Sequence, residues 1–206
     1  MAGGRKVSFV QHVRHLLARK KPPYKHIVQI GDPVLRKKCK EIPRNEILKP
    51  TNQHLISELV KMMRSRHLYS LSAPQIGVPL KIFVAELTDL KLHSNAPEKI
   101  SMETFPLKIF INPRMEVIDD KVCVELESCH SLHSYSAQVP RFKSVHVRGF
   151  DKHGEAIEWL ASGWSARVIQ HEYDHMDGIM YIDKMNTKTF SDINWQLYNY
   201  QGKLHW

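Results

Sequence analysis

The chain has 206 residues, of which 42% are apolar and 25% charged, a composition typical of one globular domain with a hydrophobic core. Its apolar runs are only a few residues long, so the sequence predicts no membrane-spanning helix. Its three cysteines are sparse and odd in number, which argues against a secreted disulfide framework and favours a reducing compartment.

The net charge of +9 is concentrated near the N-terminus. Basic residues recur between Arg5 and Lys25, no acidic residue precedes Asp32, and the rest of the chain is close to neutral. The body of the protein therefore requires no face that binds nucleic acid directly.

Residues 1–24 combine this basic charge with apolar residues at helical spacing from Phe9 to Leu17. A basic, amphipathic and acid-free segment is typical of an organelle transit peptide. A disordered basic tail, or a basic helix at a membrane or ribosome surface, is the alternative. We expect residues 25–206 to form the folded domain.

The first predicted element of the body is a helix over residues 52–66. Its apolar stripe contains Leu55, Leu59 and Met62, and Asn52 can cap its N-terminus. Three further segments of the first half have simple patterns: a turn at residues 31–33, a loop at residues 72–79 and a strand at residues 81–87.

The second half of the chain begins with a polar surface loop at residues 88–105. Four strand-like runs follow, at residues 107–112, 122–129, 144–149 and 156–160, with a hairpin turn at residues 151–154. A helix is expected from Ser165 to Met176, ended by Gly178, and a short terminal helix over residues 195–200. The predicted fold class is α+β, with antiparallel β-sheets packed around the late helix.

That late helix carries the motif His171-Glu172-Tyr173-Asp174-His175. Positions i and i+4 of a helix project from one face, so both imidazoles can reach one cation. A water on that cation would have a lowered pKa, and the carboxylate of Glu172 could take its proton. Two hydrogen-bonded core histidines are the alternative interpretation.

A hydrolytic metal site needs a third protein ligand and one open position. Tyr181 stands where a downstream histidine would be expected, no glutamate follows Glu172, and nothing favours the later aspartates, Asp177, Asp183 and Asp192. The best upstream candidate is Cys129, at the end of a strand-like run. Cys39 and Cys123 are interpreted as packing cysteines.

The sequence resembles the peptide deformylases over residues 27–195, and residues 139–195 resemble the mitochondrial type in particular. Four segments carry the resemblance: residues 72–77, with Ala-Pro-Gln; residues 127–129, near Glu-Gly-Cys; residues 170–175, with Gln-His-Glu-x-Asp-His; and the opening segment, residues 31–36. The resemblance implies a peptide deformylase-like fold, a mitochondrial location and removal of the formyl group from the N-terminal formyl-methionine of new polypeptides.

The resemblance also implies a metal site and its partners. Cys129, His171 and His175 would hold one divalent cation, Fe²⁺ in the first place and Zn²⁺ or Co²⁺ as alternatives, with Glu172 as the general base. The substrates would be N-formyl-methionyl nascent peptides, which makes ribosome proximity an expectation. A homodimer is a further expectation from the mitochondrial type.

Two donors to the developing oxyanion follow from the same resemblance: the side-chain amide of Gln75 and the backbone N–H of His130. The chain departs from the family pattern where glycines are replaced by Leu68, Ser70 and Ser128. Ser70 and His130 are expected to contact substrate, and the side chain of Ser70 could crowd it. A metal-binding homologue with weak or altered activity is therefore the first alternative. A zincin-type endopeptidase and a non-enzymatic ribosome- or RNA-associated protein are others.

Overall fold

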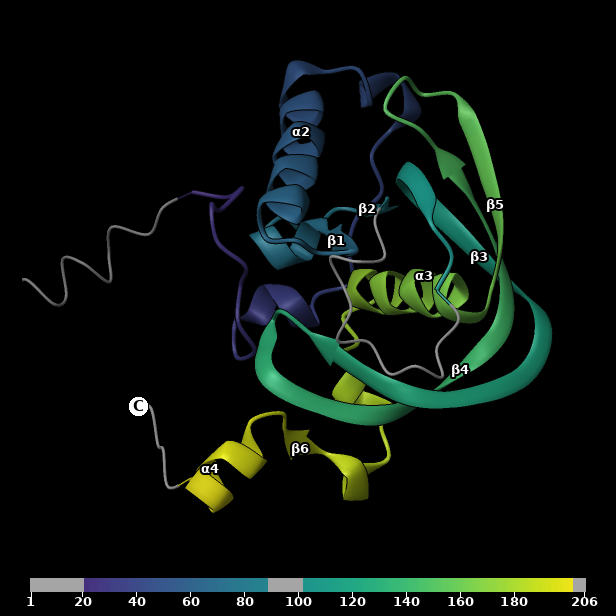
Figure 1. Cartoon of the computed structure of the whole chain (residues 1–206). Coiled ribbons are helices and arrows are strands. Elements are labelled where there is room, and N and C mark those ends of the chain that lie inside the picture. Colours follow the sequence, from purple (N-terminus) through teal and green to yellow (C-terminus); the bar gives the residue numbers. More distant parts are fainter. Residues whose placement is uncertain (1–20, 89–101, 202–206) are drawn as a thin grey trace, which may run out of the picture.

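The computed structural model describes residues 21–88 and 102–201 (Figure 1). Most of the predicted transit peptide and of the predicted loop at residues 88–105 lies outside these residues. Within them, no helix has the length and apolar character needed to span a membrane.

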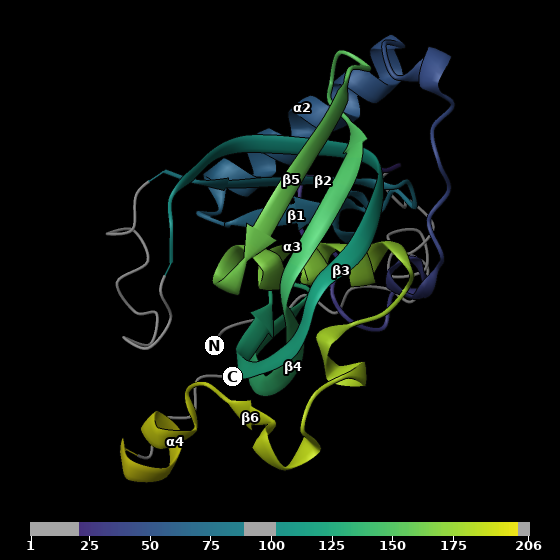
Figure 2. The ribbon, with the colours of Figure 1, turned by 90° about the vertical axis from the view of Figure 1, so that its right-hand side faces the viewer.

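A single antiparallel sheet forms the framework, with the strand order β1-β2-β3-β4-β5 and a short sixth strand, β6, beside β4. The strands are β1 (Ser70–Ser72), β2 (Ile82–Leu87), β3 (Phe105–Cys129), β4 (Leu132–Phe150), β5 (Ala156–Ser162) and β6 (Ser191–Asp192). The helices are α2 (Pro50–Ser65), α3 (Gly163–Met176) and α4 (Trp195–Gln201). The long strands β3 and β4 bend around α3 (Figures 1 and 2). The α+β prediction is therefore confirmed.

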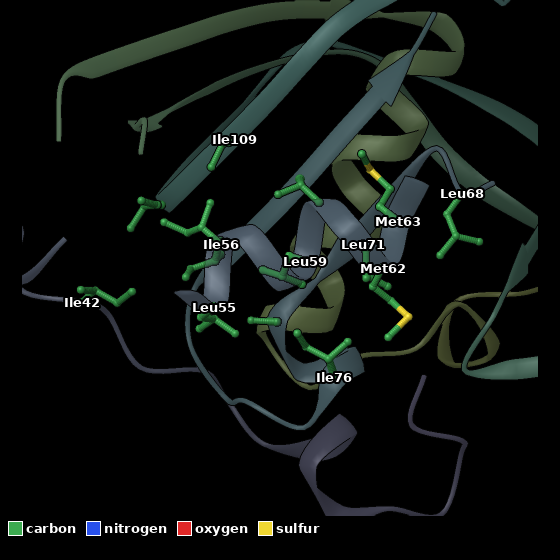
Figure 3. Close-up of a cluster of buried hydrophobic side chains, with 14 of the residues drawn as sticks. Ile42, Leu55, Ile56, Leu59, Met62, Met63, Leu68, Leu71, Ile76 and Ile109 are labelled. Atoms are coloured by element: carbon green, nitrogen blue, oxygen red, sulfur yellow. The ribbon is translucent and has the colours of Figure 1, made fainter. Parts of the chain in front are cut away.

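Two of the three hydrophobic clusters among the described residues pack a helix against the sheet. The first lies between α2 and the β1–β2 region and includes Leu59, Met63, Leu71 and Ile76, all at most 1% exposed (Figure 3). The second packs α3 against the sheet through residues such as Ile169. Each such buried side chain contributes about 1.5–3 kcal/mol relative to an exposed one. The site helix α3 is therefore fixed against the sheet by the second cluster.

Several sequence-based boundaries were wrong. Residues 107–112 and 122–129 belong to one strand, β3, whose intervening residues are mostly exposed and paired with β4. Because this part of β3 is mostly exposed, no alternation of buried apolar residues marks it in the sequence, and so the continuous strand was missed. Residues 132–143 of β4 were missed for a different reason: Ala137, Val139 and Arg141 alternate as buried positions, but one of them is an arginine and Pro140 stands within the run, so the sequence shows no apolar alternation. Cys123, interpreted as a packing cysteine, lies on this ribbon and is exposed.

The segment that contains the Ala-Pro-Gln motif also differs from the prediction. The predicted loop at residues 72–79 contains the end of β1 and the 3₁₀-helix η3 (Ala73–Ile76).

The ends of the helices were predicted less evenly. In α2, Asn52 is not the N-cap, because the helix begins earlier, at Pro50, and the Asn52 amide donates to the Glu46 carbonyl. The end of α3 agrees with the prediction, since Gly178 has a φ of +76°.

Candidate metal centre

Cys129 and the two helical histidines meet at the junction of β3 and α3. Cys129 Sγ lies 3.2 Å from His175 Nε2, which lies 3.2 Å from His171 Nε2, and all three ligand atoms lie within 4.8 Å of one another. Bonds of about 2.0–2.3 Å to a tetrahedral cation would separate ligand atoms by about 3.3–3.6 Å. One thiolate and two imidazoles thus fit a small divalent ion with one position left open.

Each of these side chains is positioned by local structure. His171 and His175 lie one turn apart on the buried face of α3, with their rings edge to face at 4.8 Å. Cys129 ends β3 where the β3–β4 register shifts, and the backbone N–H of Ser131 donates to its sulfur over 3.4 Å. Helix α3 packs against the end of β3, so the three candidate ligands, which are distant in sequence, become neighbours.

The two imidazoles also control the charge of the thiol. Burial raises the pKa of Cys129, but the charges and hydrogen bonds of His175 and His171 outweigh burial and bring it to about 5. The sulfur is therefore ready to bind a metal as thiolate at neutral pH.

Glu172 lies beside the ligands with its two carboxylate oxygens in different situations. Oε1 accepts a hydrogen bond of 2.6 Å from the Ser70 hydroxyl. Oε2 is buried and has no hydrogen-bond partner among the described residues. A buried carboxylate oxygen without a partner is suited to accept a proton from a water in the site.

Gln75 has a fixed orientation on η3. Its Oε1 accepts hydrogen bonds from the backbone N–H and the hydroxyl of Ser72, at 2.9 and 3.1 Å. Its amide nitrogen therefore points toward the centre and donates to Cys129 Sγ over 3.5 Å and to Ser131 Oγ over 3.3 Å. A side-chain amide held in this way is a preorganised donor.

A cleft of about 500 Å³ opens onto these groups. Its walls include the predicted site residues Ser70, Gln75, Cys129, His130 and Glu172. The side chain of His130 is exposed, whereas that of Ser70 is half-buried. A second hollow of about 860 Å³, near Tyr173, contains none of the predicted site residues.

The two serines that replace family glycines cause no backbone strain. Among the described residues other than glycine, only His67, Asn112 and Ser134 have positive φ. Ser70 and Ser128 therefore need no left-handed conformation.

A buried ionic network, which was not predicted from the sequence, supports the candidate metal ligand His171. Glu127 Oε1 lies 2.7 Å from His171 Nδ1, and Glu127 accepts further hydrogen bonds from Arg141 and Arg167. Arg141 also contacts Asp174 of α3 at 2.5 Å. Burial raises the pKa of Glu127, but the hydrogen bonds and charges of His171 and Arg141 lower it by more. The net pKa therefore lies below the ordinary value, and the carboxyl stays ionised.

This network fixes the ring of His171 with Nε2 facing the site. The sequence carried a signal for it, since Glu127 lies within the matched cysteine motif and Asp174 within the histidine motif. The pairing with Arg141 and Arg167 depends on how β4 and α3 pack.

Fold and site together define a hydrolytic enzyme whose Cys/His/His cluster can hold a divalent metal. The model of the polypeptide deformylase family matches residues 24–191. The chain therefore belongs to the polypeptide deformylase family.

Two relatives illustrate the similarity in sequence. The human mitochondrial peptide deformylase is 41% identical over 93% of this chain and 81% of its own length. The tomato chloroplastic peptide deformylase 1A, from Solanum lycopersicum, is 42% identical over 85% of this chain and 64% of its own length.

Solved structures show the same fold. The Thermotoga maritima peptide deformylase is 30% identical, with a TM-score of 0.64 over 79% of this chain and 98% of its own. Peptide deformylase 1B from Arabidopsis thaliana, in complex with an inhibitor, is 29% identical, with a TM-score of 0.66 over 80% of this chain and 83% of its own.

Proposed function

We propose that this protein removes the formyl group from the N-terminal formyl-methionine of newly made polypeptides. The observation that carries the proposal is the convergence of Cys129, His171 and His175 beside the free carboxylate oxygen of Glu172. A cation site in a cleft, next to a carboxylate oxygen that has no partner among the described residues, is the arrangement that hydrolysis of an amide-type bond requires.

A divalent cation held by the sulfur and the two Nε2 atoms would supply Lewis acidity, which lowers the pKa of water and polarises a carbonyl group. Glu172 would take the proton of the attacking water on Oε2 and deliver it to the leaving amine nitrogen.

Charge that develops on the formyl oxygen would be stabilised by two donors. The amide nitrogen of Gln75 is aimed at the centre because Ser72 holds the other end of the amide group. The backbone N–H of His130 is the second proposed donor. One such donor typically contributes about 3–4 kcal/mol to transition-state stabilisation.

Fe²⁺ is the proposed natural metal, with Zn²⁺ and Co²⁺ as alternatives, because one thiolate and two imidazoles accept all three ions. The proposed location is the mitochondrion. It is supported by the basic N-terminal segment and by the name of the human relative. Ribosome proximity and a homodimer stay predictions from the family resemblance.

Formate release from formyl-Met-Ala-Ser by the full chain, loaded with Fe²⁺ under anaerobic conditions, tests the function. The matched control is Glu172→Gln, which should retain metal but lose about 10²–10⁴-fold in kcat, the usual contribution of a general base. Cys129→Ala should instead lose the metal.

Two results would contradict the proposal. Absence of formate with the metal fully loaded would favour a metal-binding homologue with little activity. Cleavage within unformylated peptides would favour a zincin-type endopeptidase.

A further inference from the structure

Ser70 stands beside Glu172 at a position where peptide deformylases usually have glycine. It begins β1, and its half-buried hydroxyl donates to Glu172 Oε1 over 2.6 Å. The two residues are 102 positions apart in the sequence. Glycine has no side chain and could not make this contact.

The hydrogen bond makes the two oxygens of Glu172 unequal. Oε1 is occupied, whereas the buried Oε2 has no partner among the described residues. The terminal torsion of a glutamate side chain is otherwise loosely defined, so an unheld carboxylate can turn. A charge-assisted hydrogen bond opposes this rotation.

The donor itself is held firmly. Ser70 pairs with Ala85 of β2 in register, and its backbone avoids the left-handed region. Leu71, the next residue, is fully buried in the cluster beneath α2. The hydroxyl is thus presented from a rigid strand and not from a loop.

We infer that Ser70 is a positioning residue for the general base: its hydroxyl holds Oε1 so that Oε2 faces the reacting water. This inference rests on the proposed function. It assigns to this chain a device that replaces a glycine of the family pattern and acts through Glu172.

The competing role for Ser70 is purely spatial, because the residue also lines the cleft. A serine that only narrows the cleft would change substrate binding and not the chemical step. The two roles therefore differ in whether kcat or KM responds.

The test compares Ser70→Ala, Ser70→Gly and Ser70→Thr in the full metal-loaded chain with formyl-Met-Ala-Ser. Ser70→Thr keeps a hydroxyl on a strand position that suits a β-branched residue. Ser65→Ala is the control, since Ser65 donates to the Met62 carbonyl at the end of α2, outside the cleft.

We expect Ser70→Ala and Ser70→Gly to lower kcat about tenfold, the effect of losing one hydrogen bond to a charged group. KM should stay within about twofold, and Ser70→Thr should restore most of kcat. Metal content and the affinity for the product Met-Ala-Ser, measured by calorimetry, should match the wild type.

A double-mutant cycle shows whether Ser70 acts through the base. In the Glu172→Gln background, Ser70→Ala should have almost no further effect on kcat, because the base it positions is gone. An unchanged kcat in Ser70→Ala, or an equal loss in both backgrounds, would overturn the inference. A lower KM in Ser70→Gly with unchanged kcat would establish the spatial role instead.

Failure of the inference is separable from failure of the proposed function. Formate release by the wild type tests the function alone, and the ratio of variant to wild type tests Ser70. A wild type that releases no formate would overturn both.

Discussion

Replacing Arg141 by methionine should destabilise the fold and weaken metal binding together. The Arg141 side chain is 3% exposed, and it lies within 2.5 Å of both Glu127 and Asp174, which are 6% and 8% exposed. Breaking a buried ion pair by removing one partner costs about 3–5 kcal/mol, because a buried charge is left uncompensated.

The expected loss of stability lies at the lower end of this range, because each carboxylate keeps one other cationic partner in the Arg141→Met variant. Arg167 still lies 3.1 Å from Glu127, and Lys184 still lies 2.6 Å from Asp174. We expect a loss of about 3 kcal/mol in the free energy of unfolding, which corresponds to a fall in Tm of about 6–12 °C for a domain of this size. Because Glu127 orients His171, metal affinity should also fall by about 10–100-fold.

The control for this experiment is Arg148→Met. Arg148 pairs with Glu116 on the surface, where the side chains are 51% and 58% exposed, and such pairs contribute at most about 1 kcal/mol. Thermal unfolding followed by circular dichroism, with metal content measured on the same samples, compares the two variants. If both lost the same stability, the assignment of a supporting role to the buried network would be wrong.

The ionised state of Glu127 adds a pH dependence to this comparison. Its pKa in the folded protein lies below the ordinary 4.5, so its stabilising contribution is present above about pH 4.5 and is lost as the pH falls through the folded value. Arg141→Met should therefore show a weaker loss of stability on acidification than the wild type. Parallel curves of stability against pH would show that Arg141 does not hold this carboxylate ionised.

Two further predictions concern the thiol and the helix end. In metal-free protein, the ultraviolet thiolate band that is present in the wild type and absent in Cys129→Ser should titrate near pH 5. Cys39, whose pKa burial raises to about 12, stays protonated, and the exposed thiol of Cys123 is present in both proteins and cancels in their difference. A difference band that titrated near pH 9.0 would contradict this prediction. Gly178→Ala should lower the midpoint of urea unfolding more than Gly154→Ala does. Both glycines have positive φ, but of the two only Gly178 would place the new Cβ against a carbonyl oxygen, that of Arg36, at 2.6 Å. Left-handed strain alone costs about 1–2 kcal/mol, and overpacking adds about 1–3 kcal/mol, so equal midpoints would refute the predicted clash.

Elements with a strong local pattern were predicted well. The helix around Leu59 has an apolar face with residues at helical spacing. The helix that carries His171 and His175 has these two histidines one turn apart on its buried face. Strand β3 was broken into pieces because its middle is mostly exposed and so has no buried face to impose alternation. Cys123 was misplaced in the core for the same reason.

The roles of serines were harder to predict. Ser70 was expected to touch substrate, and the structure shows its hydroxyl bonded to Glu172. Ser72 was only part of a matched motif, yet it fixes the amide of Gln75. A serine can donate or accept in many directions, so its partner is decided by what packs beside it.

The sequence by itself determined the spacing of His171, Glu172 and His175, because a helix places residues i and i+4 on one face wherever it lies. It also determined that the N-terminal segment differs in charge from the rest of the chain. Only the tertiary structure decided that Cys129 meets this helix, that Glu127 supports His171, and that one oxygen of Glu172 is occupied. The physical reason is that these contacts join residues 46, 44 and 102 positions apart, whose approach depends on how β1, β3 and α3 pack together.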